Sequence, residues 1–436
     1  MKRDVDVFLR DAAQPVGKLT FTVEGRRQSC SFEYDARWLA APNRFQIDPA
    51  LPLVRGTQYR SKGQTDRSSS FFGCFADSEP DGWGIQVIER DHAKSIVDAR
   101  GKGKAVDSRA LNDLDYLLAV DDVSRVGALR LMVDGKFVRA SVPGRRTTPP
   151  LIEIRELITA SHAVESGTET ANDLAYLRGR GTSLGGMRPK CSVIDDDESL
   201  CIAKFPSVRD TRAVTKGEVL ALRLASLAGI EAAKARTIYS DDIPVTLVTR
   251  FDRADNGRLM YASARTLLQV DDDADHTYTE IVDAIVQNGF QPDKDRQELW
   301  RRMVFNILIN NVDDHLNNHG FIHMSSGRWK LAPAFDINPF PDKSRILKTW
   351  ISEAAGPEAS VAAAMEAAGY FKLGLVRARE VLGEVLHAVG QWREVAVGSA
   401  VGMSRREAGQ FEMAFESNER LVAEREIKAS SISKRS

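Results

Sequence analysis

Two aspartates that flank a predicted hairpin constrain the fold of this chain more than any other feature. Asp313 lies in the polar run Asn310–Asn318, directly after a segment with apolar residues at helical spacing, 296–311. Alternating residues with a Ser-Ser-Gly turn predict a hairpin over 321–332, and Asp336 follows it. Because a hairpin returns the chain to its starting edge, we expect both carboxylates to emerge at the same end of it.

The spacing of these polar residues is typical of a phosphoryl-transfer site. Asp313 is followed five residues later by Asn318, and Asp336 comes after the hairpin. Protein kinases use this order for a base that receives the acceptor proton and for two ligands of magnesium on ATP. Magnesium favours oxygen ligands of this kind. An Asn/Asp-rich turn that caps a helix is the alternative, but it does not require the second aspartate.

Three histidines follow one another at every fourth position, His315, His319 and His323. On a helix this spacing would suggest transition-metal ligands. The segment is predicted to pass from loop into strand, where the same spacing does not bring the rings together. We therefore expect His315 to support the loop and do not predict a zinc site.

A glycine-rich stretch, 179–186, precedes a predicted hairpin whose second strand, Leu200–Phe205, carries Lys204. Lys204 should share a strand face with Leu200 and Ile202. An ammonium on an apolar face needs an anion, and in kinases that anion is the nucleotide phosphate pair. Glu218, on the next predicted helix, is the candidate partner of this lysine, whereas a lysine on a solvated strand face is the alternative.

The glycine-rich stretch matches neither of two better-known phosphate loops. Gly186 is followed by Met-Arg where a P-loop has Lys-Ser/Thr, and Leu184 stands where a dinucleotide fingerprint has glycine. Its backbone NH groups could still approach phosphates, with Arg188 and Lys190 adding positive charge. A plain flexible loop is the alternative. A phosphate on Ser183 would repel ATP and could expel the loop.

Length and composition exclude several classes of protein. A chain of 436 residues with 43% hydrophobic content should form two or three packed units. Sixty basic residues balance sixty-one acidic ones, so charge alone favours neither nucleic acid nor membrane. The four cysteines lack metal-ligand spacing, the first twenty residues lack a signal-peptide core, and no run reaches about 18 apolar residues. We expect a cytoplasmic protein that does not enter a membrane.

The predicted fold is α+β, with a β-rich N-terminal subdomain and a helical C-terminal lobe in a two-lobed, protein-kinase-like arrangement. Strands joined by tight turns around Gly17 and Gly25 should start the chain. The proline-rich stretch 141–150 is the best linker candidate. The predicted segments are an N-terminal subdomain, a small lobe, a helical catalytic lobe and a disordered tail, at 1–145, 146–270, 271–425 and 426–436.

Taken together, these motifs resemble the HipA family of bacterial serine/threonine kinases, the toxins of HipBA-type toxin–antitoxin modules. The likeness covers nearly the whole chain, and it rests on the following segments: Leu51-Pro52-Leu53, Phe75–Gly82, Thr182–Lys190, Ile202–Pro206, Arg250–Arg253, Asn311–Asn318 and Phe335-Asp336. The motif continues as Ile337-Asn338, where ordinary protein kinases have Phe-Gly. Their activation switch is therefore not expected here.

The resemblance implies ATP and magnesium as cofactors, with Asp313 as the catalytic base and Asn318 and Asp336 as metal ligands. It implies a nucleotide-binding set consisting of Thr182, Ser183, Leu184, Gly185, Gly186, Lys204, Thr249, Phe251 and His315. Autophosphorylation of Ser183 is expected to switch the enzyme off.

The family also implies the partners. One would be a HipB-like helix-turn-helix antitoxin, through which the contact with DNA would be indirect. The other would be a protein substrate among translation components, such as an aminoacyl-tRNA synthetase. Two other functions stay open from the sequence. One is a nucleotide-binding corepressor that mainly clamps a DNA-binding antitoxin, and the other is a small-molecule kinase on a related scaffold.

Overall fold

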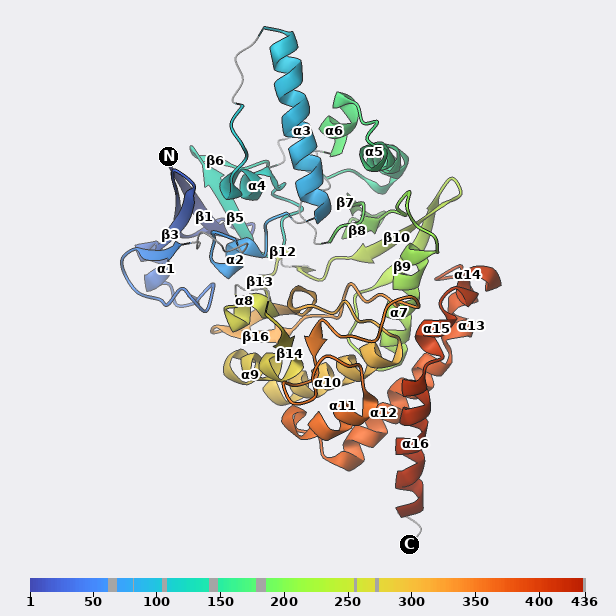
Figure 1. Cartoon of the computed structure of the whole chain (residues 1–436). Coiled ribbons are helices and arrows are strands. Elements are labelled where there is room, and N and C mark those ends of the chain that lie inside the picture. The colour runs from blue at the N-terminus through green and yellow to red at the C-terminus, as the bar shows by residue number, and fades with distance from the viewer. Residues whose placement is uncertain are drawn as a thin grey trace. The chain divides into compact units, whose positions relative to one another are not determined.

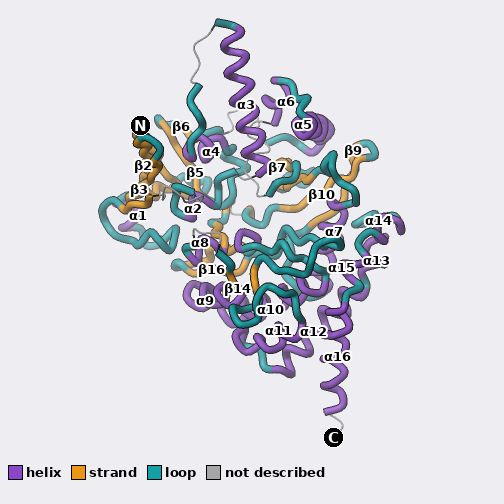
Figure 2. The backbone as a smooth tube through the Cα atoms, in the orientation of Figure 1, coloured by secondary structure: helices purple, strands orange, loops and turns teal. Residues whose placement is uncertain are grey.

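A computed structural model describes residues 1–61, 69–80, 82–103, 108–140, 148–177, 186–254, 257–270 and 274–433 of the chain. The chain forms two compact units. The first comprises Met1–Asp210 with Tyr239–Ala262, and the second comprises Thr211–Ile238 with Ser263–Ser436. Most strands belong to the first unit and most helices to the second (Figure 1; Figure 2). The α+β class predicted from the sequence is confirmed.

The first sheet of the first unit has six strands in the order β4-β3-β2-β1-β5-β6. All neighbouring strands in it are antiparallel. The strands are β1 (Lys2–Leu9), β2 (Gln14–Glu24), β3 (Arg27–Tyr34), β4 (Gln58–Ser61), β5 (Leu129–Val133) and β6 (Lys136–Phe137). Alternate residues face the core, so Val5, Leu19 and Phe32 lie opposite one another in register and are fully buried.

One of the two predicted turns in this sheet is wrong. Gly17 lies inside β2, where a Cβ would come within 2.3 Å of the Glu33 carbonyl oxygen, so the close approach of β3 requires glycine. The chain turns earlier, between Arg10 and Ala13, both of which have positive φ. The turn at Gly25, with φ +61°, is where the pattern placed it.

Helices complete the first unit around aromatic side chains. They are α1 (Ala36–Ala40), α2 (Gly73–Ala76), α3 (Gly82–Gly101), α4 (Asp113–Ala119), the 3-10 helix η1 (Leu151–Glu153), α5 (Ile154–Ser166) and α6 (Ala171–Leu177). Phe21 and Phe71 pack at 5.4 Å between ring centroids, and Phe32 and Phe75 at 5.7 Å. These rings join the sheet to α2, which makes one buried core.

The second sheet has the order β7-β8-β10-β9. Its strands are β7 (Lys190–Ile194), β8 (Leu200–Lys204), β9 (Ala235–Ser240) and β10 (Ile243–Thr249). The predicted β7–β8 hairpin is confirmed, with Cys191 opposite Ala203. After β10 come the short strands β11 (Arg253–Ala254) and β12 (Gly257–Arg258), which pair with each other. Within the second sheet, β8 carries Lys204 and lies between β7 and β10, both of which are antiparallel to it.

The second unit is mainly helical. Its helices are α7 (Val214–Leu227), α8 (Ala264–Leu268), α9 (Tyr278–Asn288), α10 (Pro292–Leu308), the 3-10 helix η2 (Leu316–Asn318), α11 (Val361–Ala367), the 3-10 helix η3 (Ala368–Phe371), α12 (Leu375–Gly390), α13 (Trp392–Val397), α14 (Arg405–Gly409), α15 (Glu412–Phe415) and α16 (Asn418–Ser433). Its strands are β14 (His276–Thr277), which pairs with β17 (Thr349–Trp350), and the hairpin β15 (Gly320–Ser325) and β16 (Arg328–Leu331). The strand β13 (Tyr261–Ser263) contains the last two residues of the first unit.

α7, the helix that carries Glu218, packs against α12 and α13. Most of its length is buried, although Leu227 at its end is 54% exposed. Because α7 packs with the C-terminal helices, it belongs to the second unit. The two units therefore differ from the segments 146–270 and 271–425 expected from the sequence.

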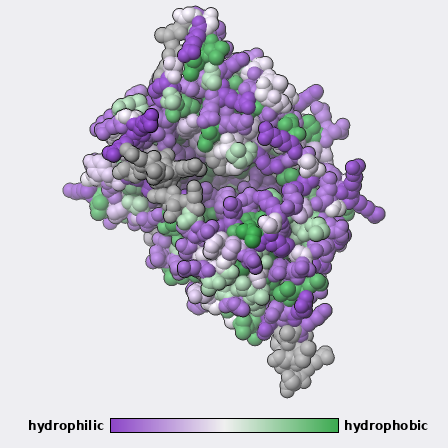
Figure 3. All heavy atoms as spheres, in the orientation of Figure 1, coloured by the Kyte–Doolittle hydropathy of each residue, from purple (hydrophilic) through white to green (hydrophobic). Residues whose placement is uncertain are grey.

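The C-terminal tail, predicted to be disordered, is helical through Ser433 within α16. Of the described helices, none combines the length and apolar character needed to cross a bilayer. Hydrophilic residues cover most of the face drawn in Figure 3, and the hydrophobic residues on it form small separate groups.

Candidate active site

The loop that carries Asp313 begins where α10 ends. The last helical residue is Leu308, three residues earlier than predicted. Asn310 then adopts a left-handed conformation, with φ 54°, which asparagine tolerates better than most residues. This residue turns the chain out of the helix, and the loop runs on to η2.

Asp313 and Asn318 lie at the two ends of this loop and contact each other. The Asn318 side chain donates from Nδ2 to the main-chain oxygen of Asp313 at 3.2 Å. The Asp313 carboxylate is 45% exposed and has Lys343 Nζ at 3.2 Å from its Oδ2. An exposed carboxylate on a loop that is tied in place can reach a substrate hydroxyl.

Asp336 lies beyond the β15–β16 hairpin, as predicted. The hairpin closes with a hydrogen bond from Ala332 N to Gly320 O at 2.8 Å, so the chain does return to the edge where the loop ended. Asp336 has φ 55°, a left-handed conformation that costs a residue with a Cβ roughly 1–2 kcal/mol. Asn338 donates from Nδ2 to its main-chain oxygen at 3.3 Å and stabilises this turn.

One asparagine connects the loop of Asp313 to the loop of Asp336, and a second ties it to α10. Asn311 donates from Nδ2 to Asn306 Oδ1 at 3.1 Å, and its own Oδ1 accepts from the backbone NH of Asn338 at 3.4 Å. Asn306 and Asn311 are buried. The bond between Asn311 and Asn338 holds the two loops together at one edge of the hairpin.

Asp314, which the sequence analysis left without a role, is buried beneath the loop. Its Oδ2 accepts from Asn306 Nδ2 at 2.8 Å and from the Tyr278 hydroxyl, and His319 Nε2 lies 3.1 Å away. Burial would raise the pKa of this carboxyl, but His319 and Tyr278 outweigh burial and leave the pKa below its usual value. The paired aspartates in the sequence thus divide into one exposed and one buried, and the buried one anchors the loop.

The three histidines occupy different environments. His315 is exposed, so it does not support the loop from inside as we expected. His319 has that position, 5.4 Å from the ring of Tyr278 between centroids. His323 lies on β15, where its Nε2 accepts from the backbone NH of Gly327 at 3.2 Å. An exposed His315 remains available to a ligand.

Lys204 stands at the end of β8, opposite Thr246 of β10 and Lys190 of β7. On this strand Cys201 and Ala203 are fully buried, whereas Lys204 is only partly buried. The predicted need for an anion to compensate a buried ammonium is therefore weaker than the pattern suggested. Glu218, proposed as its partner, is buried on α7 in the second unit.

The glycine-rich stretch enters the described residues only at its end. Thr182, Ser183, Leu184 and Gly185 lie outside them, so their predicted roles stay predictions. Gly186 has φ 94°, and a Cβ there would meet Lys190 Nζ at 2.8 Å. Arg188, expected to add charge to this loop, forms a salt bridge with Asp210 instead.

Thr249 is the last residue of β10, and Phe251 lies two residues beyond it. A buried cluster of charged side chains stabilises the end of this strand. Asp252 accepts from Arg250 Nε at 2.7 Å, from Arg253 at 2.7 Å and from the backbone NH of Gly127 at 2.8 Å. Burial would raise the pKa of Asp252, but the two guanidiniums outweigh burial and hold the pKa well below its usual range.

The arginines of this cluster also reach the turn before β5. Arg250 donates to Ser124 O at 3.0 Å, and Arg253 donates to Val123 O and Arg125 O, both at 2.8 Å. Burial lowers the pKa of Arg253 to about 10, which leaves it charged at neutral pH. The cluster thus joins segments more than a hundred residues apart in the chain, and the local sequence pattern contained no signal for it.

The oxygen atoms of Asn318 and Asp336 suit magnesium. Asn318 uses its Nδ2 for Asp313, so its Oδ1 is the atom of this amide that would bind a cation. Among the described residues, no group of three or more His, Cys, Asp or Glu side chains could hold a metal ion. Magnesium fits such a sparse set, because it is commonly bound by one or two carboxylates together with substrate phosphates and water.

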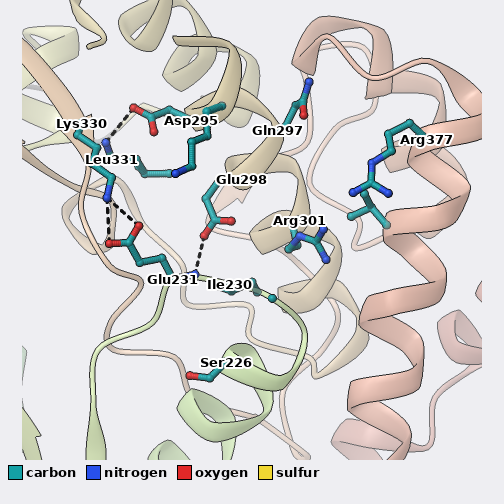
Figure 4. A pocket seen from close by; sticks show the side chains of 13 residues that line it. Ser226, Ile230, Glu231, Asp295, Gln297, Glu298, Arg301, Lys330, Leu331 and Arg377 are labelled. Atoms are coloured by element: carbon teal, nitrogen blue, oxygen red, sulfur yellow. Dashed lines mark hydrogen bonds and ion pairs between the residues drawn. The ribbon is translucent and has the colours of Figure 1, made fainter. Parts of the chain in front are cut away.

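Figure 4 shows a polar pocket elsewhere in the second unit, with a volume of about 500 Å³. Its charged side chains mainly bind one another or the backbone, as Lys330 does with Glu231 at 2.8 Å and Glu298 with the Glu231 NH at 3.0 Å. No residue of the predicted site lines it.

Two family models match this chain in order along its length. The HipA N-terminal domain matches residues 5–101, and the HipA-like C-terminal domain matches residues 182–393. The chain belongs to the HipA family. The C-terminal match contains the loops of both Asp313 and Asp336, so the resemblance drawn from the sequence motifs is confirmed.

Similar proteins support the same placement. HipA of Shewanella oneidensis MR-1, solved with HipB and its operator DNA, superposes with a TM-score of 0.66 over 94% of this chain and 96% of that chain, at 14% identity. The two proteins therefore share a fold. A putative kinase of Haemophilus influenzae is 24% identical over 189 residues, and the match covers 37% of this chain and 55% of that relative. The chain thus spans about half the length of this curated relative.

Proposed function

We propose that this HipA family member is an ATP- and magnesium-dependent serine/threonine protein kinase that acts as a growth-inhibiting toxin. The observation that carries the proposal is the Asn311 bridge, which ties the loop of Asp313 and Asn318 to the loop of Asp336. A base and two metal ligands have to be held together for in-line transfer, where positioning and charge neutralisation supply most of the catalysis.

In this proposal the exposed carboxylate of Asp313 accepts the proton of the acceptor hydroxyl. Asn318 and Asp336 bind the magnesium ion, which neutralises the phosphates of ATP when it is present. Lys204 binds the α- and β-phosphates. Gly186 approaches them with its backbone, together with the glycine-rich loop that precedes it. Three more residues complete the nucleotide-binding set, namely Thr249, Phe251 and His315.

The regulation proposed for the family member has two parts. Phosphorylation of Ser183 places a dianion in the glycine-rich loop, where it repels the phosphates of ATP. A HipB-like helix-turn-helix antitoxin is the proposed partner, because the fold is that of a HipA solved together with HipB and operator DNA. DNA contact would then be indirect, and the proposed substrate is a protein of the translation machinery, such as an aminoacyl-tRNA synthetase.

Transfer from labelled ATP to proteins of a cell lysate tests the activity. The purified chain with magnesium should label a small set of proteins on serine or threonine, and Asp313→Ala should abolish labelling and growth arrest. Asn317→Ala is the matched control, because Asn317 is an exposed neighbour on the same loop. A corepressor would instead repress its operator equally well with Asp313→Ala, and a small-molecule kinase would label no protein.

Calorimetry tests the nucleotide and metal roles separately. ATP with magnesium should bind the wild-type chain, and Asp336→Asn should weaken binding with magnesium more than binding without it. Ser183→Ala should abolish any slow loss of activity during incubation with ATP. Failure of the wild-type chain to bind ATP with magnesium would overturn the proposed function.

A further inference from the structure

The segment that follows Asp336, Phe340–Thr349, runs along the loop of Asp313. Phe340 NH donates to Asn310 O at 3.3 Å, and Lys348 NH donates to Val312 O at 3.0 Å. Thr349 donates from Oγ1 to Asp314 O at 2.6 Å. These bonds fix the segment to the loop at both of its ends.

A single buried amide fixes the middle of the segment. Asn310, 2% exposed, donates from Nδ2 to Phe340 O at 2.5 Å and to Lys343 O at 3.2 Å. Asn310 also starts the loop of Asp313, so the main chain of Lys343 is attached directly to that loop. The position of the lysine is thus set by local bonds.

This attachment places the Lys343 ammonium beside the Asp313 carboxylate. Nζ lies 3.2 Å from Asp313 Oδ2 and 3.7 Å from the centroid of the Phe340 ring, so a cation–π contact also holds the ammonium. Within the described part of the chain, no other side chain donates to this carboxylate. Oδ2 is therefore engaged, and Oδ1 is left for a substrate.

Stability gives no reason for this arrangement. The Lys343 and Asp313 side chains are 43% and 45% exposed, and ion pairs of that kind contribute little to folding. Geometry gives a better reason, because a base must present a defined oxygen to the proton that it removes. A carboxylate on an exposed loop would otherwise rotate about its side-chain bonds.

We propose that Lys343 is a positioning residue for the base Asp313, an inference that rests on the proposed function. Its ammonium holds Oδ2, and Oδ1 accepts the proton of the acceptor hydroxyl. The hydroxyl oxygen then forms a bond to the γ-phosphorus, and the bond from that phosphorus to the bridging oxygen breaks. ADP leaves with the electron pair of that bond, and the proton on Asp313 passes to solvent.

Steady-state kinetics of Lys343 variants test this role. In Lys343→Ala, kcat for protein phosphorylation should fall roughly ten- to hundredfold with KM for ATP unchanged, since misplacement of a catalytic group costs up to about that much. Lys343→Arg should recover most of the loss. Lys348→Ala, in an exposed lysine of the same segment, is the control and should match the wild type, as should the thermal midpoint of every variant.

A double-mutant cycle separates positioning from other roles. In an Asp313→Asn background, residual transfer should not change further on Lys343→Ala, because the lysine acts through that carboxylate. An equal further loss would overturn the inference, and so would an unchanged kcat in Lys343→Ala alone. Both results presuppose transfer by the wild-type chain, whose absence would overturn the proposed function as well.

Discussion

Two buried carboxylates, one in each unit, anchor loops that carry residues of the proposed site, and they are stabilised by different means. Asp252 holds the end of β10 with two arginines and a backbone NH. Asp314 holds the loop of Asp313 with the ring of His319 and with the neutral donors Tyr278 and Asn306. The pKa of both acids is lowered, for Asp252 by two arginines, and for Asp314 by His319 first and then by the hydrogen bond from Tyr278.

The difference lies in what remains when one partner is lost. At Asp252, removal of the carboxylate would leave buried guanidiniums without their counter-ion, which is costly. At Asp314, loss of one neutral donor leaves two others in place. Loss of the Asp252 carboxylate should therefore cost a large part of the unfolding free energy at once. Loss of one donor to Asp314 should cost only a fraction of the stability that this carboxylate provides.

The largest effect is expected for Asp252→Ala. Because Arg250 and Arg253 would stay buried without a partner, the free energy of unfolding should fall by about 3–5 kcal/mol. Denaturant titration measures this, with Arg155→Ala as control, since the exposed Arg155–Asp241 pair should contribute at most about 1 kcal/mol. Equal losses of unfolding free energy in the two variants would contradict the large contribution expected of the buried Asp252 cluster.

A smaller effect is expected for Tyr278→Phe. The ring stays in place, but the hydroxyl that donates to Asp314 is lost, and a hydrogen bond to a charged group contributes roughly 1.5–3 kcal/mol. Tyr370→Phe, at a 65% exposed tyrosine of the same unit, should change the unfolding free energy very little. If Tyr278→Phe cost as much as Asp252→Ala, the smaller loss expected for one donor to Asp314 would be refuted.

The smallest effect concerns pH. The pKa values of both Asp252 and Asp314 are lowered in the folded chain, so each carboxylate stabilises the fold above the unfolded pKa of about 3.9. That stability is lost as pH falls below this value toward the folded pKa. In Asp252→Asn the slope of unfolding free energy against pH should decrease by up to about 1.4 kcal/mol per unit below pH ~4. Denaturant titrations at several acidic pH values measure the slope, and an unchanged slope would contradict the assignment.

Local pattern predicted the parts of the site that depend on neighbouring residues. The β15–β16 hairpin and the return of the chain to Asp336 follow from alternation and a glycine turn. The turn at Gly17 was wrong because glycine serves two purposes, tight turning and close approach of another strand, and sequence alone does not separate them. The tail, 426–436, looked polar enough to be disordered, yet α16 continues through Ser433.

Contacts over long sequence separations could not be predicted in this way. Arg250 and Arg253 resembled part of a family motif, but their bonds go to the turn at Val123–Arg125. Asp314 and His319 stand beside the residues that drew attention, and only burial separates their roles from those of Asp313 and His315. The sequence names the side chains of such clusters, but it does not give the distances between them.

The route of the chain through its two units has a consequence for synthesis on the ribosome. α7 emerges well before α12 and α13, the helices that it packs against within the second unit. Until those helices are translated, the apolar surface of α7 has no partner there, and exposed surface of that kind favours aggregation. Slow translation of the C-terminal third would lengthen this vulnerable interval, so chaperone demand should depend on elongation rate after α7.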